Sequence, residues 1–303
     1  MHEVLLKTKR CGYTDTVFLG SVFLANEDNI IFNCGENIDN ISFMRSLAKP
    51  IQASILFDSN IINEYNITNA ELAIFSGSHS GTNRHINLLK HALIKRGLKI
   101  SQLSLEAIEP LDKKDFKGRC SKLHNNCSGK HIMMLLNCKY FGYNYDYTNP
   151  NHPLQVRIKE KQEKLSNYKS DILTLDGCST PLWGLPYKNI IISYFNLIKT
   201  YPALINAIIK NSYIYGGNNR FDTEIIKLGK GNLFAKVGAG GLVLVYNFQK
   251  KEILLIKMAQ DNNEYRRIIT LDYLNKLHWL NIYIDKNIYN QKKQIVANYE
   301  FSL

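Results

Sequence analysis

The spacing of apolar residues changes along the chain, and this change constrains the class of fold. Apolar runs at residues 17–25 and 30–32 flank a polar turn, which is typical of a β-hairpin. Late in the chain, residues 242–248 and 252–258 flank a second polar turn and predict another hairpin. Helical spacing prevails between the hairpins. We therefore predict an α+β fold, with packed helices and an antiparallel sheet whose strands come from both termini.

The central part carries the helical pattern. This pattern predicts helices over residues 42–62, 83–96, 126–138 and 153–165, with Gly97 and Pro153 placed as a helix stop and a helix start. A short, strand-like apolar segment occupies residues 72–75, and further strands are expected near 279–284 and 295–301. No linker-like stretch divides the chain, so a single domain over residues 1–303 is expected.

Composition indicates an ordinary globular chain, with 45% hydrophobic and 21% charged residues. No run of about 18 apolar residues occurs in the sequence, so neither a transmembrane helix nor a membrane partner is expected. The apolar run near the start imitates a signal peptide, but the turn and second apolar run behind it favour a strand. Six cysteines are too few for a disulfide framework, which favours a reduced, cytoplasmic protein.

The formal net charge of +12 raises the question of nucleic-acid binding. The basic residues are scattered, and the sequence contains no zinc-finger spacing, aromatic RNA-binding signature or basic helix. A solvated basic surface, which also favours a small anionic substrate, is the preferred interpretation. No nucleic-acid partner is expected.

Two serines and two lysines are candidates for nucleophilic catalysis. Ser46 and Lys49 are three residues apart, so one helical face can hold both groups, and a lysine with a lowered pKa can take the serine proton. Ser78 lies in a small-residue turn that can expose its hydroxyl, and Lys236 precedes a glycine-rich turn. Each residue alone is more typical of an exposed helix position, a helix cap or an edge strand.

Cysteine, lysine and histidine residues form a second group of candidates. Cys127 and Lys130 fall on one helical face beside His131, and Cys178 lies in another turn. Isolated cysteines are usually small buried hydrophobic residues, and the sequence has no four-ligand zinc spacing. The long polar run before Cys127 is nevertheless unusual for a core cysteine.

Together these motifs resemble one family, the rhizobial-type, class 3 L-asparaginases. The resemblance runs from about Arg10 to Asp261, and its most specific block is His124-Asn125-Asn126-Cys127-Ser128-Gly129-Lys130-His131. The other shared blocks are residues 45–52, Ser78-His79 with Gly81, residues 152–155, Asp176-Gly177-Cys178 with Pro181, residues 220–223 and residues 236–239.

The resemblance implies a fold similar to serine β-lactamases and glutaminases, and a homodimer that hydrolyses L-asparagine to L-aspartate and ammonia. It implies two serine–lysine tandems, Ser46 with Lys49 and Ser78 with Lys236. It also implies a Zn²⁺ ion held by Cys127, Lys130 and Cys178, for which the lysine must lose its proton. Our candidates for holding the substrate are Arg45 for its α-carboxylate, Asp176 for its α-ammonium group, and His131.

These roles form a coherent reaction. We expect Ser46 to attack the substrate carboxamide while Lys49 accepts its proton, and the Ser78–Lys236 pair to pass a proton to departing ammonia. Backbone N–H groups near the start of the Ser46 helix would hold the oxyanion, and water would then hydrolyse the aspartyl ester. We expect the metal to position the pocket rather than supply the nucleophile.

The sequence departs from the family pattern at three positions. Asp15 and Phe18 stand where the family carries a glutamate and a histidine, and Gly240 replaces a glutamate in the glycine-rich turn. Substrate affinity or dimer geometry is therefore open. Two alternatives also remain: a related hydrolase such as a glutaminase or a β-lactam-recognising protein, or a basic binding protein without catalysis. The absence of complete S-D-N and K-T-G elements from the sequence disfavours the β-lactam alternative.

Overall fold

In the computed structural model, which describes residues 1–114 and 116–302, the chain divides into two compact units. Unit 1 joins the N-terminal segment Met1–Asn40 to the C-terminal segment Leu228–Leu303, and unit 2 is Ile41–Lys227. The single domain expected over residues 1–303 stays a prediction. No helix among the described residues is both long and apolar enough to cross a bilayer.

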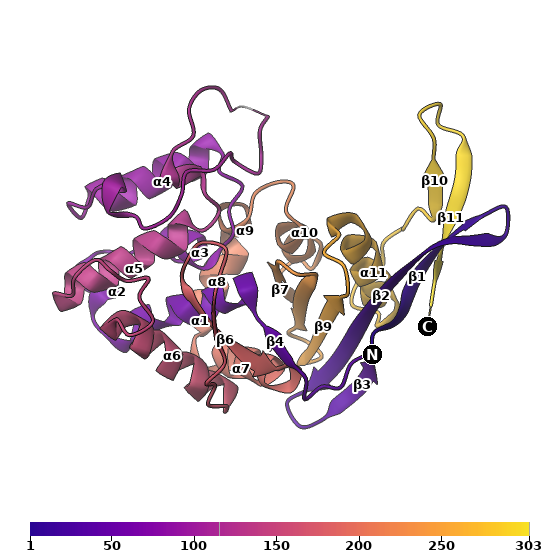
Figure 1. Ribbon diagram of the computed structural model, residues 1–303, viewed down its shortest axis with the longest axis horizontal. Coiled ribbons are helices and arrows are strands. Elements are labelled where there is room, and N and C mark those ends of the chain that lie inside the picture. The colour runs from indigo at the N-terminus through magenta and orange to yellow at the C-terminus, as the bar shows by residue number, and fades with distance from the viewer. Residues whose placement is uncertain (115, 303) are drawn as a thin grey trace. The chain divides into compact units, whose positions relative to one another are not determined.

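The sheet of unit 1 is antiparallel and takes strands from both termini, as predicted (Figure 1). Its order is β10-β11-β1-β2-β9-β8-β7, and β3 pairs with β2. The strands are β1 Glu3–Arg10, β2 Tyr13–Asn26, β3 Ile30–Cys34, β7 Leu233–Gly238, β8 Leu242–Asn247, β9 Glu252–Met258, β10 Asn287–Tyr289 and β11 Ile295–Phe301. N- and C-terminal segments meet at the β1–β11 and β2–β9 pairs, so both ends of the chain are needed to build this sheet.

Unit 1 also contains helix α11, Asn263–Lys276, which begins after the capping side chain of Asn262. The predicted strand near residues 279–284 is wrong, because this segment is irregular. The side chain of Asn275 donates to the carbonyl of Ile282 at 2.7 Å and accepts from its N–H at 3.1 Å. These bonds occupy the backbone groups that a strand ladder would need.

The three departures from the family pattern all lie in unit 1 and have local partners there. Asp15 forms an exposed ion pair with Arg10 at 3.4 Å. The ring of Phe18 stacks on Tyr265 of α11 with 3.6 Å between centroids. Gly240 adopts a φ of +74°, which favours glycine, and its N–H donates to the carboxylate of Asp261 at 2.6 Å.

Unit 2 is mostly helical and carries a small antiparallel sheet of order β4-β6-β5 (Figure 1). Its strands are β4 Ile41–Phe43, β5 Leu173–Leu175 and β6 Pro181–Pro186. Its helices are α1 Ala48–Ala53, α2 Ile61–Glu64, α3 Asn69–Ser76, α4 Asn83–Ile94, α5 Ser128–Phe141, α6 Pro153–Ser166, α7 Tyr187–Thr200, α8 Pro202–Lys210, α9 Ser212–Tyr215 and α10 Phe221–Leu228, whose last residue is assigned to unit 1. The predicted helices over residues 83–96, 126–138 and 153–165 are confirmed as α4, α5 and α6.

Two predictions for unit 2 are wrong. The apolar segment at residues 72–75 is part of helix α3 rather than a strand. A capping box starts that helix earlier, because Thr68 accepts from the N–H of Glu71 at 3.2 Å and donates its own N–H to the Glu71 carboxylate at 2.8 Å. The helix predicted over residues 42–62 is broken into β4 and short helical pieces. Arg45 there has a φ of +50°, and Pro50 lacks the N–H that a continuous helix would need.

Candidate functional site

Most candidate site residues lie in unit 2, on segments that approach one another closely at glycine residues. Gly77, between α3 and Ser78, approaches the chain so closely that an added Cβ would lie 2.0 Å from the carbonyl oxygen of Tyr215. Gly129, in the first turn of α5, approaches α3, where an added Cβ would lie 2.2 Å from the carbonyl oxygen of Ile74. These glycines let Ser78 and the start of α5 pack into the interior.

Lys49 and Ser78 form the buried polar centre of unit 2. Each side chain is only 1% exposed. The amine of Lys49, in the first turn of α1, donates to the hydroxyl of Ser78 at 2.9 Å and to the carbonyl of Asn126 at 3.1 Å. The structure thus brings Lys49 to Ser78, which the sequence had paired with a different lysine.

Ser46 precedes Lys49 in a 3-10 helix over Arg45–Leu47. The carbonyl of Leu47 accepts a hydrogen bond from the buried Tyr194 hydroxyl at 2.6 Å, which anchors this segment. Ser46 is half-buried, and its hydroxyl makes no hydrogen bond to any residue in the described parts of the chain. Its hydroxyl therefore has bonding capacity to offer to a ligand.

Lys236 lies in unit 1, on strand β7. Its side chain is fully buried, and its amine donates to the carbonyl of Val237 at 3.1 Å. The predicted meeting of Lys236 with Ser78 remains a prediction.

Asp176 contacts two cationic side chains of the site. Its carboxylate accepts from the guanidinium of Arg45 at 3.0 Å and lies 3.6 Å from the amine of Lys130. The two residues that we expected to bind opposite ends of a substrate are thus ion-paired with each other. The Arg45 side chain is 36% exposed, whereas that of Asp176 is 10% exposed, so the guanidinium is the more accessible partner.

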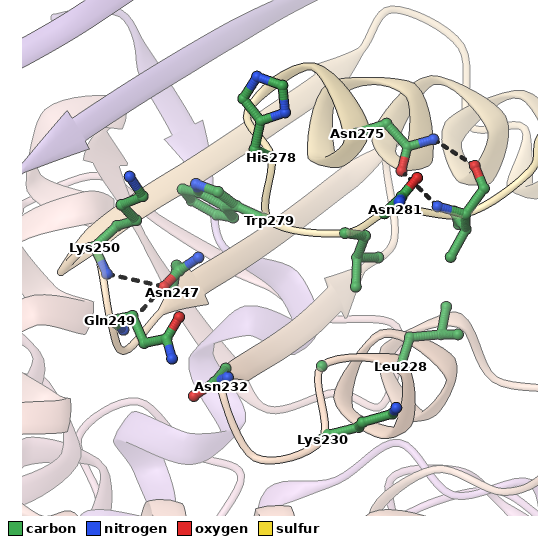
Figure 2. A pocket seen from close by; sticks show the side chains of 13 residues that line it. Leu228, Lys230, Asn232, Asn247, Gln249, Lys250, Asn275, His278, Trp279 and Asn281 are labelled. Carbon is green, nitrogen blue, oxygen red and sulfur yellow. Dashed lines mark hydrogen bonds between the residues drawn. The ribbon is translucent and has the colours of Figure 1, made fainter.

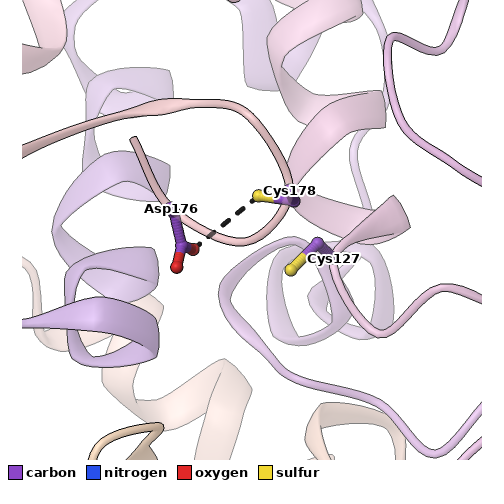
Figure 3. A group of neighbouring side chains, drawn as sticks. All are labelled: Cys127, Asp176 and Cys178. Atoms are coloured by element: carbon purple, nitrogen blue, oxygen red, sulfur yellow. Dashed lines mark hydrogen bonds between the residues drawn. The ribbon is translucent and has the colours of Figure 1, made fainter. Parts of the chain in front are cut away.

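Two buried thiols lie beside Asp176 (Figure 3). The sulfurs of Cys127 and Cys178 and an Asp176 carboxylate oxygen are all within 4.8 Å of one another, and the Cys178 sulfur is 3.7 Å from Asp176 Oδ2. Thiolate sulfur and carboxylate oxygen are donors that Zn²⁺ takes in proteins. The donor set therefore fits zinc, and it includes Asp176, which sequence reasoning had assigned to substrate binding only.

The two thiols have unequal acidities because they share one proton. The hydrogen bond from Cys127 lowers the pKa of Cys178, and the nearby Lys130 amine also favours the Cys178 thiolate, against the opposing effect of burial. The same hydrogen bond, together with burial, raises the pKa of Cys127 well above its usual value. The site therefore concentrates negative charge on Cys178.

Lys130 is buried among these groups. Its amine donates to the hydroxyl of Thr180 at 2.7 Å. Burial lowers the pKa of Lys130, but its electrostatic interactions with Cys178, Cys127 and Asp176 outweigh this effect, so the net pKa is raised. In this arrangement Lys130 is an ammonium group, and it would have to release a proton before it could bind a metal.

His131 interacts with Cys178 and is fully buried. Its Nδ1 is 3.0 Å from the Tyr147 hydroxyl, while Nε2 has no hydrogen-bond partner among the described residues. Burial lowers the pKa of His131 although Cys178 acts in the opposite direction, so the ring is neutral at pH 7. Its predicted role in substrate binding remains a prediction.

Sequence reasoning missed several partners of this site. His79, which follows Ser78 in the sequence, is fully buried, and its Nε2 lies 2.9 Å from the hydroxyl of Ser128. Burial, and then the charges of His85 and Lys49, lower the pKa of His79 well below 6.5. The neighbouring Ser78-His79 dipeptide was the available signal for His79. Thr180, two residues after Cys178, carried no such signal.

The sequence from residue 6 to residue 300 matches the family described as L-asparaginase II. Among solved structures, the chain is similar to a β-lactamase from Mycobacterium bovis, at 12% identity and TM-score 0.42, with 85% of this chain and 94% of that chain covered. It is also similar to a peptidoglycan synthesis regulatory factor (PBP3) from Streptococcus pneumoniae, at 13% identity and TM-score 0.48, with 93% and 82% covered. A penicillin-binding protein from Bacillus halodurans aligns at 10% identity and TM-score 0.40, with 84% and 96% covered.

No curated protein matches the sequence. The family match nevertheless spans nearly the whole chain, including every candidate site residue in both units. The protein belongs to the L-asparaginase II family.

Proposed function

We propose that this protein is a rhizobial-type, class 3 L-asparaginase that hydrolyses L-asparagine to L-aspartate and ammonia. Family membership makes it an asparaginase-type amidohydrolase with a small-molecule substrate. The observation that carries the proposal is the buried hydrogen bond between Lys49 and Ser78. Lys49 is three residues along the chain from Ser46. A serine next to a lysine–serine pair has the groups that covalent amide hydrolysis requires.

In the proposed reaction, the Ser46 hydroxyl attacks the side-chain carbonyl of asparagine and transfers its proton to the Lys49 amine. The C–N bond then breaks as the leaving nitrogen receives a proton, which releases ammonia and leaves an aspartyl ester on Ser46. The Lys49–Ser78 hydrogen bond supports a route for that proton, with Lys236 as the second lysine of the relay. Water hydrolyses the ester and restores Ser46, so one water is consumed for each ammonia released.

Substrate orientation in this proposal depends on Arg45 and Asp176. Arg45 is the accessible cation of the site, and a guanidinium binds a carboxylate through two parallel N–H donors. A substrate carboxylate would therefore compete with Asp176 for Arg45. Release of the Asp176 carboxylate from that pair would let it face the substrate ammonium group.

Cys127 and Cys178 would hold a Zn²⁺ ion, with Lys130 as the third ligand implied by the resemblance and Asp176 as the donor that the geometry adds. A bound zinc ion supplies Lewis-acid polarisation of a nearby oxygen. The chain's own contribution is the ion pair between Asp176 and Arg45, the residue that precedes Ser46 in the sequence. We therefore propose a positioning role for this group of residues.

The experiment that tests this function measures ammonia release from L-asparagine, L-glutamine and buffer, with a chromogenic β-lactam assayed in parallel. We expect asparagine to be hydrolysed faster than glutamine, and the β-lactam to remain intact. Faster release from glutamine would indicate a glutaminase instead. If no amide is hydrolysed, while a nucleic acid binds with a strong salt dependence, the proposal is wrong and a basic binding protein is favoured.

We also propose that the protein is a cytoplasmic homodimer. All six cysteines are free thiols, which suits a reducing compartment. Size-exclusion chromatography with light scattering measures the assembly, and a monomer at micromolar concentration would contradict the dimer. Localisation of the tagged protein in its own cells measures the compartment.

A further inference from the structure

Unit 1 contains a pocket of about 780 Å³ that the proposed reaction does not use. It is formed by the loop before β7, the turn between β8 and β9, and the segment after α11 (Figure 2). All its lining residues are in unit 1. Its volume falls within the range of roughly 300–1,000 Å³ that is usual for small-molecule sites.

The ionisable residues of the lining are all basic. Lys230, Lys250 and His278 contribute to the lining, and none of the lining residues is an aspartate or a glutamate. Neither lysine forms an ion pair with any residue in the described parts of the chain. Two unpaired ammonium groups around one hollow create a positive potential, which attracts an anion.

The pocket also offers a ring and neutral amides. Trp279 lies in the wall with its side chain largely covered, so its ring is held in place by packing (Figure 2). The side chains of Asn232, Gln249 and Asn281 line the pocket and make no hydrogen bond within the described parts of the chain. Each amide can both donate and accept, whereas a bare inorganic anion would need donors only. The pocket is also much larger than such an ion.

The walls of the pocket are preformed. The Asn247 side chain accepts from the N–H groups of Gln249 and Lys250, at 2.9 Å each, which fixes the β8–β9 turn. Asn275 holds the segment after α11 through its two bonds to Ile282. A site whose walls are already ordered loses little conformational entropy when a ligand binds.

From these observations we infer that the pocket binds a small organic anion whose ring packs on Trp279 while its phosphate or carboxylate lies between Lys230 and Lys250. This site shares no residue with the serine–lysine centre, and it does not depend on the proposed function. Phosphate and carboxylate ligands share the same chemistry here, so the test uses one probe of each kind.

Isothermal titration calorimetry of the full chain tests the inference with adenosine 5′-monophosphate and nicotinate as anionic probes. Adenosine, nicotinamide and inorganic phosphate are the matched probes that lack either the charge or the ring. We expect at least one anionic probe to bind, and its affinity to fall as salt is added. Fluorescence of Trp279 in a Trp183→Phe background reports contact with the ring, since the chain has only these two tryptophans.

The matched variants are Lys230→Gln/Lys250→Gln and, as a control, Lys227→Gln/Lys251→Gln, which removes two nearby charges outside the lining. We expect the first pair of substitutions to lower the affinity for the anionic probe about tenfold, and the control pair to leave that affinity nearly unchanged. Binding of neither anionic probe would overturn the inference, as would equal binding of the neutral analogues or equal loss in the control pair. Inorganic phosphate that binds as tightly as adenosine 5′-monophosphate would overturn the part assigned to Trp279.

Discussion

The amine of Lys49 donates a hydrogen bond to the hydroxyl of Ser78 at 2.9 Å, and both groups are shielded from solvent. A buried bond of this kind lets a proton move between the two side chains without exchange with bulk water. It also ties the first turn of α1 to the turn that follows α3. The predictions below test this arrangement and its surroundings.

Replacement of Lys49 by methionine should lower turnover by about 10²- to 10⁴-fold, because the proposed proton acceptor is lost. Ammonia release measures the effect, and a thermal melt shows whether the variant is folded. Lys90→Met is the matched control, since Lys90 is an exposed lysine of helix α4. Full activity in folded Lys49→Met would remove Lys49 from the mechanism.

Acid quenching during turnover should trap an aspartyl ester on the peptide that contains Ser46. The expected site follows from the half-buried Ser46 hydroxyl, whereas the Ser78 hydroxyl is already bonded to Lys49. Peptide mass spectrometry locates the adduct. Ser46→Ala should show no adduct, and Ser101→Ala, which changes an exposed serine, should behave like the parent protein. An adduct on the Ser78 peptide would exchange the roles of the two serines.

Zinc content should fall when either buried thiol is removed. Cys127→Ser and Cys178→Ser should each lose most of the bound metal, because each replaces a sulfur donor with a weaker one. Inductively coupled plasma mass spectrometry of the purified protein measures the number of zinc ions per chain. Cys11→Ser, at an exposed cysteine, is the control. Lys130→Met should also lose the metal. If it retains zinc while Asp176→Asn loses it, the carboxylate is the third ligand instead.

Stability should decrease as the pH falls below about 6.5, because folding keeps His79 neutral. Burial lowers its pKa in the folded state, so between the two pKa values the unfolded chain binds a proton that the folded chain does not. The free energy of unfolding should therefore drop by up to about 1.4 kcal/mol per pH unit for this one group, and the contribution is complete above the unfolded pKa.

Chemical denaturation at about pH 7.5 and about pH 5.5 measures this slope. His79→Gln should have a shallower slope than the parent protein, whereas His91→Gln, at an exposed position, should not. Equal slopes in all three proteins would show that His79 is protonated as easily in the folded state as in the unfolded state.

Gly77→Ala should destabilise the protein by about 1–3 kcal/mol, because the new methyl group would overlap the carbonyl oxygen of Tyr215. The backbone shift that relieves this overlap should also displace Ser78 and lower turnover, since small misplacements of reacting groups slow catalysis. Gly177→Ala is the control for stability, because its nearest neighbour would lie at an ordinary 3.8 Å. A Gly77→Ala variant with unchanged melting temperature would mean that the backbone moves aside without cost.

Much of the fold could be predicted where a local pattern is strong. The hairpin of β8 and β9 follows from two apolar runs around a polar turn, and α6 follows from Pro153 and helical spacing. The prediction failed at α3, whose short apolar segment lacks a clear period. There the capping box between Thr68 and Glu71 determines the helix, through side-chain bonds to the backbone.

The sequence alone determined which chemical groups the protein carries: the serines, lysines and thiols of the shared blocks, and hence the family. Tertiary structure alone decided their partners, pairing Lys49 with Ser78 and placing Asp176 among Arg45, Lys130 and Cys178. The physical reason is that local patterns report on neighbours within a turn or a strand. Contacts between distant segments depend instead on how closely the helices pack, and here Gly129 permits the close approach of α5 to α3.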